Sequence, residues 1–242
     1  DAIDHEIYAE PFVGMGGVFF ARTRRPKGEI INDVNRDVVT LFRILNRHYP
    51  QFIDVLRFQL TTRADFQRLM ETPADVLTDL ERAARFLYLQ RATFGGKVRG
   101  RTFGVSTTGA RFNLSKLEPM FQEVHERLTG VVIECLDWKA FLDRYDRPGT
   151  LFYLDPPYYG HERDYGEGVF SREDFRLMAE RLAHLRGRFI LSLNDTPEVR
   201  TIFHGFTFEE AEVTYMVGGA AKAKRVGEVI ITGPVKGAAT GV

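Results

Sequence analysis

The fold is indicated most clearly by the stretch Leu151-Phe152-Tyr153-Leu154-Asp155-Pro156-Pro157-Tyr158. In it, an apolar run leads directly into a carboxylate and two prolines. The apolar part predicts a buried strand, and ligands of open α/β sheets bind just beyond the carboxyl ends of such strands. The prolines keep the following backbone extended and remove two N–H donors, so carbonyl groups there face outward. A carboxylate, a carbonyl and an aromatic ring at one point form a site for a planar amine.

Further apolar segments predict strands over residues 7–9, 29–33, 131–135 and 189–193, with a closing pair over 206–216 and 226–232. Helices are predicted over 36–49, over 73–91 with Thr72 as cap, over 115–128 with a Ser115…Glu118 capping box, and from Ser171 to Gly187. This alternation predicts an α/β fold, with a mostly parallel sheet covered on both faces and an antiparallel closing strand.

Residues 51–113 interrupt the alternation, and we interpret them as an inserted, mainly helical subdomain. Residues 1–50 and 114–242 then form the domain that contains the sheet. The total charge is zero, from 33 acidic and 33 basic residues. The distribution is uneven, however, because eight basic residues and no acidic one lie between Arg82 and Leu117. A local basic patch of this kind is typical of phosphate binding.

The single cysteine, Cys135, excludes a disulfide framework and a zinc site built from cysteines. It lies in an apolar run, so we expect its side chain to pack in a core. Because a single cysteine cannot form a disulfide within the chain, we also expect the protein to work in a reducing compartment. No apolar run reaches the length of a membrane span, and the first residues do not resemble a signal peptide. We expect no metal site.

A glycine-rich turn and two further carboxylates extend the predicted site. The turn, Phe12-Val13-Gly14-Met15-Gly16, lies between a strand and a helix, where glycines let the backbone approach a ligand. Asp33 is placed to hold a ribose diol, and Asp137 to accept from an adenine amino group. A turn without ligand, a capping or surface role for Asp33 and a capping role for Asp137 remain open alternatives. NAD and S-adenosylmethionine both fit this crevice, and the amine site at Asp155 favours the second.

The ordered motifs Glu10-Pro11-Phe12-Val13-Gly14-Met15-Gly16, Ile31-Asn32-Asp33-Val34-Asn35 and Asp155-Pro156-Pro157-Tyr158 resemble the D12 class of DNA adenine-N6 methyltransferases. Segments 86–91, 94–96 and 112–113, together with Arg99, add to the resemblance. It implies a Rossmann-like methyltransferase fold that uses S-adenosylmethionine to methylate N6 of a flipped adenine in double-stranded DNA. It also implies a cytoplasmic enzyme, bacterial or phage-encoded, from a restriction–modification system or a prophage, without an obligate protein partner.

The resemblance assigns roles to individual residues. The catalytic motif is Asp155, Pro156, Pro157 and Tyr158. The cofactor residues are Glu10, Phe12, Gly14, Gly16, Asp33, Asp137 and Asp155. Within 51–113, the target-recognition subdomain, the DNA-binding residues are Arg91, Lys97, Arg99, Arg101 and Arg111.

The chain departs from the family at three places. Nothing before Glu10 matches the family's Gly-Gly-Lys-type cofactor motif, and the chain starts at Asp1, so we interpret it as a trimmed fragment. Gln90 and Gly95 stand where the family has asparagines, which leaves the target sequence open. The alternatives are methylation of another amine, such as cytosine N4 or an RNA adenine, and a catalytically silent DNA-binding module.

Overall fold

The structure is a computed structural model that describes residues 3–93, 112–162, 168–215 and 224–234. The chain forms two compact units. Unit 1 comprises Asp1–Val13, Ala21–Val34 and Leu136–Val242, and unit 2 comprises Gly14–Phe20 and Asn35–Cys135. Each unit is described by itself.

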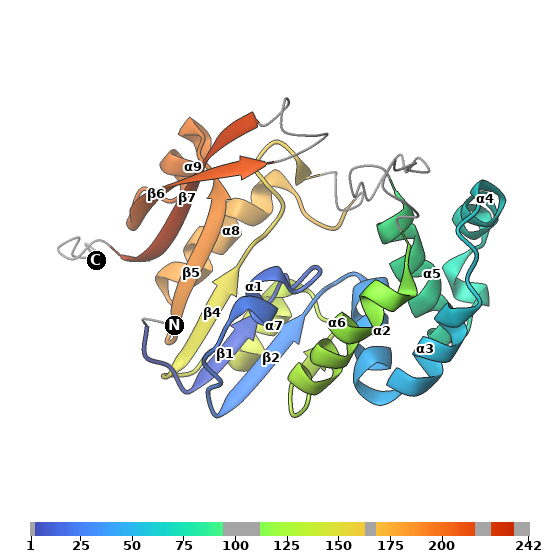
Figure 1. The fold of residues 1–242 in the computed structure, drawn as a ribbon. Coiled ribbons are helices and arrows are strands. Elements are labelled where there is room, and N and C mark those ends of the chain that lie inside the picture. The colour runs from blue at the N-terminus through green and yellow to red at the C-terminus, as the bar shows by residue number, and fades with distance from the viewer. Residues whose placement is uncertain (1–2, 94–111, 163–167, 216–223, 235–242) are drawn as a thin grey trace. The chain divides into compact units, whose positions relative to one another are not determined.

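Unit 1 contains a mixed sheet whose strands have the order β2-β1-β4-β5-β7-β6 (Figure 1). The strands are β1 (Ile7–Glu10), β2 (Gly28–Asn32), β4 (Thr150–Leu154), β5 (Arg188–Asn194), β6 (Phe206–Tyr215) and β7 (Lys224–Pro234). β2, β1, β4 and β5 run parallel, whereas β7 pairs antiparallel with both β5 and β6. The prediction of a mostly parallel sheet with an antiparallel closing strand is therefore confirmed.

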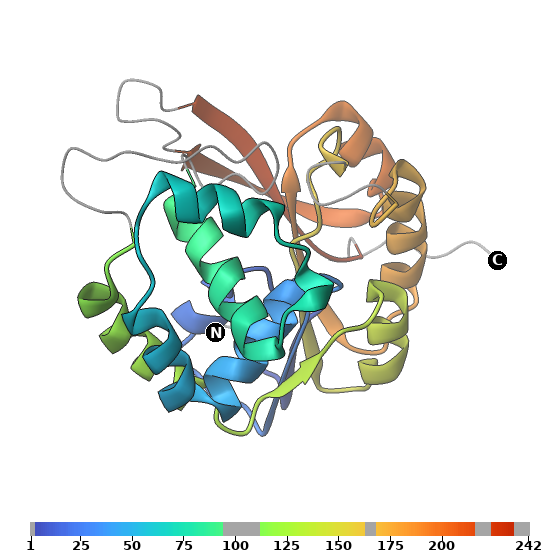
Figure 2. The ribbon, with the colours of Figure 1, turned by 90° about the vertical axis from the view of Figure 1, so that its right-hand side faces the viewer.

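Three helices cover one face of this sheet (Figure 2): α7 (Trp138–Tyr145), α8 (Arg172–Ala183) and α9 (Pro197–Ile202). Phe152 of β4 and Leu191 of β5 pack in one fully buried cluster with Phe141 of α7 and Phe175 of α8. Burial of side chains this large is the main favourable contribution to folding, and it fixes the strands whose ends carry the site.

Unit 2 is mainly helical. Its helices are α1 (Gly17–Ala21), α2 (Arg36–Arg47), α3 (Tyr49–Arg57), α4 (Arg63–Glu71), α5 (Asp79–Ala92) and α6 (Leu114–Arg127), with a short strand β3 (Val132–Glu134). α2 packs against α3, α5 and α6, and α3 packs against α5 and α6. The helices of segment 51–113 therefore share a core with α2 and α6, which lie outside that segment. The functional division at residues 51 and 113 remains a prediction.

Several predicted helix ends were wrong. Thr72 ends α4 instead of starting the next helix, and α5 begins after Thr78, whose side chain forms a capping box with Glu81. A strong cap six residues downstream thus outcompetes Thr72. α6 begins after Asn113, so Ser115 lies inside the helix and caps nothing.

Two other helix predictions also differ from the structure. The helix expected over 36–49 ends at Arg47, because Tyr49 begins a separate helix, α3, with Pro50 in its first turn. α8 begins with the predicted Ser171 cap but ends at Ala183, before Gly187. A Cβ atom at Gly187 would lie 2.7 Å from the Thr150 carbonyl oxygen, so this glycine allows close packing instead of ending the helix.

Cys135 is exposed, which corrects its predicted burial. It follows β3, a strand of only three residues in which Val132 is exposed as well. An apolar run buries its side chains only where other elements cover it, and the run itself does not reveal that cover.

Candidate active site

Asp155 directly follows β4, and the chain leaves the sheet there through the buried Pro156 and Pro157. Tyr158, next along the chain, is half-buried. Water reaches Asp155, yet the surrounding protein disfavours its charged form, and the Glu228 carboxylate of β7 repels it. Together these effects raise the pKa of Asp155 to about 6. Asp155 is therefore an ionised acceptor at neutral pH and a neutral acid in mildly acidic solution.

The backbone reverses immediately after the motif. The His161 N–H donates to the Tyr158 carbonyl at 2.8 Å, and Gly160 has a φ of 88°. A left-handed residue at the third position of a four-residue turn is the pattern of a type II turn, where glycine is favoured. The Tyr159 ring packs on Phe175 of the core, with ring centroids 5.3 Å apart. The turn thus ties the end of the motif to unit 1.

Asn194, the last residue of β5, holds the same segment through its side-chain amide. Its Oδ1 accepts from the Tyr159 N–H at 2.8 Å, and its Nδ2 donates to the Tyr159 carbonyl at 3.1 Å. The Asn194 side chain is buried, with the whole residue 9% exposed. Sequence reasoning missed this residue, although a polar residue ending an apolar strand was a visible signal.

Glu10 ends β1 as a buried carboxyl group, with the residue only 2% exposed. Burial raises its pKa to about 8. A hydrogen bond from the Tyr8 hydroxyl and the Arg22 cation oppose this shift, while the carboxylates of Asp155 and Glu29 reinforce it. Glu10 therefore keeps its proton at neutral pH, in contrast to Asp155.

A buried polar network packs against the Tyr8 ring. The Arg22 guanidinium lies 3.4 Å from the centre of the Tyr8 ring and pairs with Glu29 at 3.1 Å. Arg22 also donates to His5 Nε2 at 2.8 Å, while His5 Nδ1 donates to the Ile3 carbonyl at 2.7 Å. This arrangement suits a neutral imidazole, and burial accordingly lowers the pKa of His5.

Asn32, at the end of β2, joins two loops of the predicted cofactor site. Its Nδ2 donates to the carbonyls of Pro11 at 2.9 Å and Leu136 at 3.0 Å, and its Oδ1 accepts from the Leu136 N–H at 2.7 Å. The Asn32 carbonyl also accepts from the Val13 N–H at 2.9 Å. One buried amide therefore fixes the segments that carry Phe12, Asp33 and Asp137, although sequence reasoning gave Asn32 no role.

The side chains beside Asn32 differ in how they are used. Asp33 is half-buried just past β2. Phe12 packs edge-on against Phe170, with ring centroids 6.0 Å apart. Asp137 caps α7 by accepting from the Lys139 N–H at 2.9 Å, so the capping alternative is observed. The ribose role of Asp33 and the adenine role of Asp137 remain predictions.

Comparison with known proteins decides the family. Residues 1–217 match the D12 class N6 adenine-specific DNA methyltransferases. The chain belongs to this family. It is thus an adenine-specific DNA methyltransferase with the expected Rossmann-like methyltransferase fold.

Relatives of this D12 methyltransferase include viral and bacterial proteins. The Type II methyltransferase M.CviBI of Paramecium bursaria Chlorella virus NC1A is 22% identical over 95% of the chain and 88% of its own length. The DNA adenine methylase of Haemophilus influenzae is 24% identical over 84% of the chain and 76% of its own length. The DNA N-6-adenine-methyltransferase of Escherichia phage P1 is 29% identical over 83% of the chain, which corresponds to 28% of that longer protein.

The two glycines of the glycine-rich turn belong to unit 2, whereas Phe12 and Val13 belong to unit 1. Gly14 and Gly16 have φ values of 51° and 77°, which favour glycine. A Cβ atom at Gly16 would also lie 2.4 Å from the Phe20 ring. The backbone conformation thus explains why glycine stands at both positions, and the role of these glycines in cofactor binding remains a prediction.

Most of the predicted DNA-binding residues lie outside the described part of the chain. These are Lys97, Arg99, Arg101 and Arg111, whereas Arg91 is exposed in the last turn of α5. Two other basic residues of the same stretch already have structural partners. Arg82 pairs with Asp37 at 2.5 Å, and Arg85 donates to the Leu69 carbonyl at 2.7 Å.

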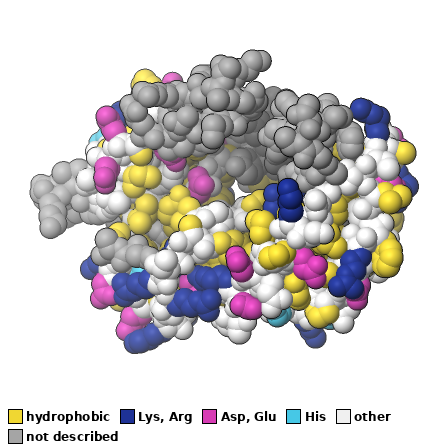
Figure 3. All heavy atoms as spheres, viewed as in Figure 1, with side chains coloured by type: hydrophobic (Ala, Val, Ile, Leu, Met, Phe, Trp, Pro, Cys, Tyr) yellow, Lys and Arg dark blue, Asp and Glu magenta, His cyan; other side chains and the backbone are white. Residues whose placement is uncertain are grey.

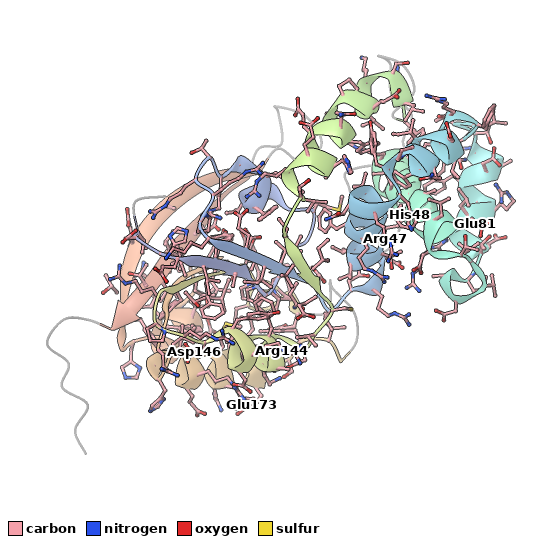
Figure 4. All side chains as sticks on the ribbon, turned by 90° about the horizontal axis from the view of Figure 1, so that it is seen from below. Arg47, His48, Glu81, Arg144, Asp146 and Glu173 are labelled. Carbon is pink, nitrogen blue, oxygen red and sulfur yellow. The ribbon has the colours of Figure 1, made fainter. Side chains whose placement is uncertain are left out.

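Two hollows of the methyltransferase surface do not include Asp155. One, in unit 2, is lined by residues that include Arg47 and His48, near the start of α5 where Glu81 lies (Figure 4). The other, in unit 1, includes Asp146 and Arg186, which precede β4 and β5 and so mark the amino ends of these strands.

On the face seen in Figure 3, acidic and basic side chains of the described residues are interspersed. Within the same described ranges, no helix is both long and apolar enough to cross a membrane.

Proposed function

We propose that the chain transfers a methyl group from S-adenosylmethionine to N6 of adenine in double-stranded DNA, at the carboxyl end of β4. One observation carries the proposal. The neighbouring parallel strands β2, β1 and β4 are followed or ended by Asp33, Glu10 and Asp155 at the same edge of the sheet. This edge is where α/β sheets bind their ligands.

The chemistry of these groups suits the cofactor. S-adenosylmethionine supplies an electrophilic methyl group on a positively charged sulfur. Its ribose hydroxyls match the half-buried Asp33, and its positive charge matches the buried carboxyl group of Glu10. Phe12, Gly14, Gly16 and Asp137 complete the proposed cofactor residues.

Asp155 and the Pro156 carbonyl act on the base. They accept hydrogen bonds from the two N6–H groups and thereby turn the nitrogen lone pair, otherwise delocalised into the ring, toward the methyl group. The new N–C bond forms as the C–S bond breaks, the electron pair of the C–S bond stays on sulfur, and N6 gives one proton to Asp155 or to water. The contribution of the protein is positioning and electrostatic stabilisation.

DNA must present the base outside the helix, because N6 cannot reach the motif from within a duplex. In this proposal Tyr158 stacks on the flipped adenine. Arg91, Lys97, Arg99, Arg101 and Arg111 bind the backbone, which offsets an unstacking cost of a few kcal/mol. We place the enzyme in the cytoplasm of a bacterial or phage-infected cell, where such DNA is found.

Substitution of Asp155 tests the proposal. We expect Asp155→Ala to abolish methylation, and the exposed control Asp143→Ala on α7 to retain it. Because a protonated Asp155 accepts hydrogen bonds poorly, the wild-type rate should fall as the pH drops below about 6. The measurement is nucleoside mass spectrometry of duplex DNA after incubation with labelled cofactor. Label in N4-methylcytosine, or methyl transfer by Asp155→Ala at the wild-type rate, contradicts the proposal.

A further inference from the structure

We propose that Asn194 is a positioning residue for methyl transfer, whose side-chain amide fixes the Tyr159 peptide and thereby sets the Tyr158 ring relative to Asp155. The inference rests on the proposed function of Asp155 and Tyr158, and it adds a residue from a different strand.

The covalent structure of the motif makes an external support necessary. Pro156 and Pro157 have no N–H groups, so the first backbone donors after Asp155 are those of Tyr158 and Tyr159. The Tyr159 N–H donates to Asn194 Oδ1 at 2.8 Å, and the Tyr159 carbonyl accepts from Asn194 Nδ2 at 3.1 Å. Two bonds from one planar amide define both the position and the orientation of this residue's backbone.

Asn194 is itself held rigidly. It lies at the end of β5, which pairs with β4 on one side and with β7 on the other, and its partner in β7 is Glu228. Leu191 and Leu193, just before it, are fully buried. The Asn194 amide therefore holds the loop after β4 in a fixed position relative to β5.

Tyr159 receives two further contacts that hold it against α8. Its ring packs on Phe175, and the Arg172 guanidinium lies 5.4 Å from the ring centre. The Tyr158–His161 hydrogen bond then closes the turn. Tyr158 thus lies between a proline pair and a clamped residue, so loss of the clamp shifts the backbone that carries the ring proposed to stack on the base.

Positioning of this kind affects the chemical step more than binding, because a displacement of about 1 Å can reduce a rate on the order of 10²-fold. We expect Asn194→Ala to lower the single-turnover methylation rate roughly 10- to 100-fold, with S-adenosylmethionine and DNA affinities within about threefold of wild type. Asn194→Gln keeps both polar groups but moves them outward by one methylene, so it should retain thermal stability and still react slowly.

Thr150→Val is the matched control. Thr150 is buried at the amino end of β4 and donates to the Tyr145 carbonyl at 3.0 Å, so the control also removes a buried side-chain hydrogen bond. The substrate is a duplex oligonucleotide with the site found by sequencing methylated adenines in DNA from expressing cells. Rate, affinities and melting temperature are measured for all variants.

The outcomes separate this inference from the proposed function. An inactive wild-type chain under conditions where the cofactor binds contradicts the proposed function itself. If the wild type is active and Asn194→Ala and Asn194→Gln react as fast as Thr150→Val, the positioning role is wrong. Should Asn194→Ala not fold, Asn194→Gln alone decides: a wild-type rate overturns the inference, and a slow rate at an unchanged melting temperature supports it.

Discussion

Glu10 and Asp155 are carboxyl groups of the candidate active site that carry different charges at neutral pH. Glu10 has a pKa of about 8 because burial outweighs the help it receives from Tyr8 and Arg22, whereas Asp155 has a pKa of about 6. The Asp155 carboxylate adds to the effect of burial and disfavours a negative charge on Glu10. A positively charged cofactor changes this balance.

Proton release tests this relation at the residue scale. Because a nearby cation favours the charged form of Glu10, we expect S-adenosylmethionine binding to release up to about one proton at pH 7 to 7.5. Cofactor affinity should therefore rise as the pH increases toward 8. Calorimetry in buffers of different ionisation enthalpy measures the number of protons released.

Glu10→Gln is the control, because glutamine resembles the protonated acid in shape and charge. It should fold normally and release no proton on binding. In the wild type the raised pKa makes the folded state hold a proton that the unfolded state loses, so stability should fall as the pH rises from about 4.5 to 8. Equal proton release by both proteins would show that Glu10 does not face the cofactor.

At the scale of elements, the strands bring the site together through polar residues at their ends. β2 ends in Asn32, which bonds to the loops after β1 and before α7, and β5 ends in Asn194, which bonds to the loop after β4. A buried side-chain amide suits this role because it both donates and accepts in a fixed plane. The described loops that carry Phe12, Asp137 and Tyr158 are thus each held by an asparagine at the end of β2 or β5.

Asn32→Ala is the test at this scale. It leaves the buried Pro11 carbonyl and the half-buried Leu136 carbonyl and N–H without their partner, so we expect a loss of about 2–4 kcal/mol in the free energy of unfolding. Affinity for S-adenosylmethionine should fall as well, because Phe12, Asp33 and Asp137 lie next to the released segments. Urea denaturation and cofactor titration measure the two effects.

The control for Asn32→Ala is Asn46→Ala, which removes one side-chain bond to the Leu128 carbonyl in unit 2. It should cost less stability and leave cofactor affinity unchanged. A wild-type cofactor affinity in folded Asn32→Ala would separate the loops from cofactor binding.

For the whole molecule, the charge distribution predicts how DNA binds. The chain is neutral in total, yet Lys97 and Arg99 belong to a stretch without acidic residues. Each phosphate contact contributes about 0.9 to the slope of log affinity against log salt. Lys97→Ala with Arg99→Ala should therefore weaken DNA binding and reduce this slope by roughly 2.

Fluorescence anisotropy at several salt concentrations measures the slope. Lys27→Ala with Arg176→Ala is the control, since these exposed basic residues lie outside segment 51–113. The same slope in both double variants would mean that Lys97 and Arg99 do not contact phosphate.

The parallel strands, the closing pair and the order of the family motifs could all be predicted from the amino-acid sequence. Apolar runs of strand length and the Asp155–Tyr158 motif are local signals, which persist whatever the rest of the chain does. Helix starts were less certain because capping signals compete: Thr78 with Glu81 took the start expected at Thr72. The DNA contacts stay predictions, because most of the basic residues concerned lie outside the described residues.

The groups that support the candidate site, and the charges they carry, depend instead on contacts between segments that are distant in sequence. The raised pKa of Glu10 depends on burial under elements distant in sequence, and Asn194 reaches Tyr159 only because β5 lies beside β4. The exposure of Cys135 likewise depends on what covers β3. A residue's type and its neighbours in sequence state which bonds it can form, whereas burial and partners from other strands determine which bonds it does form.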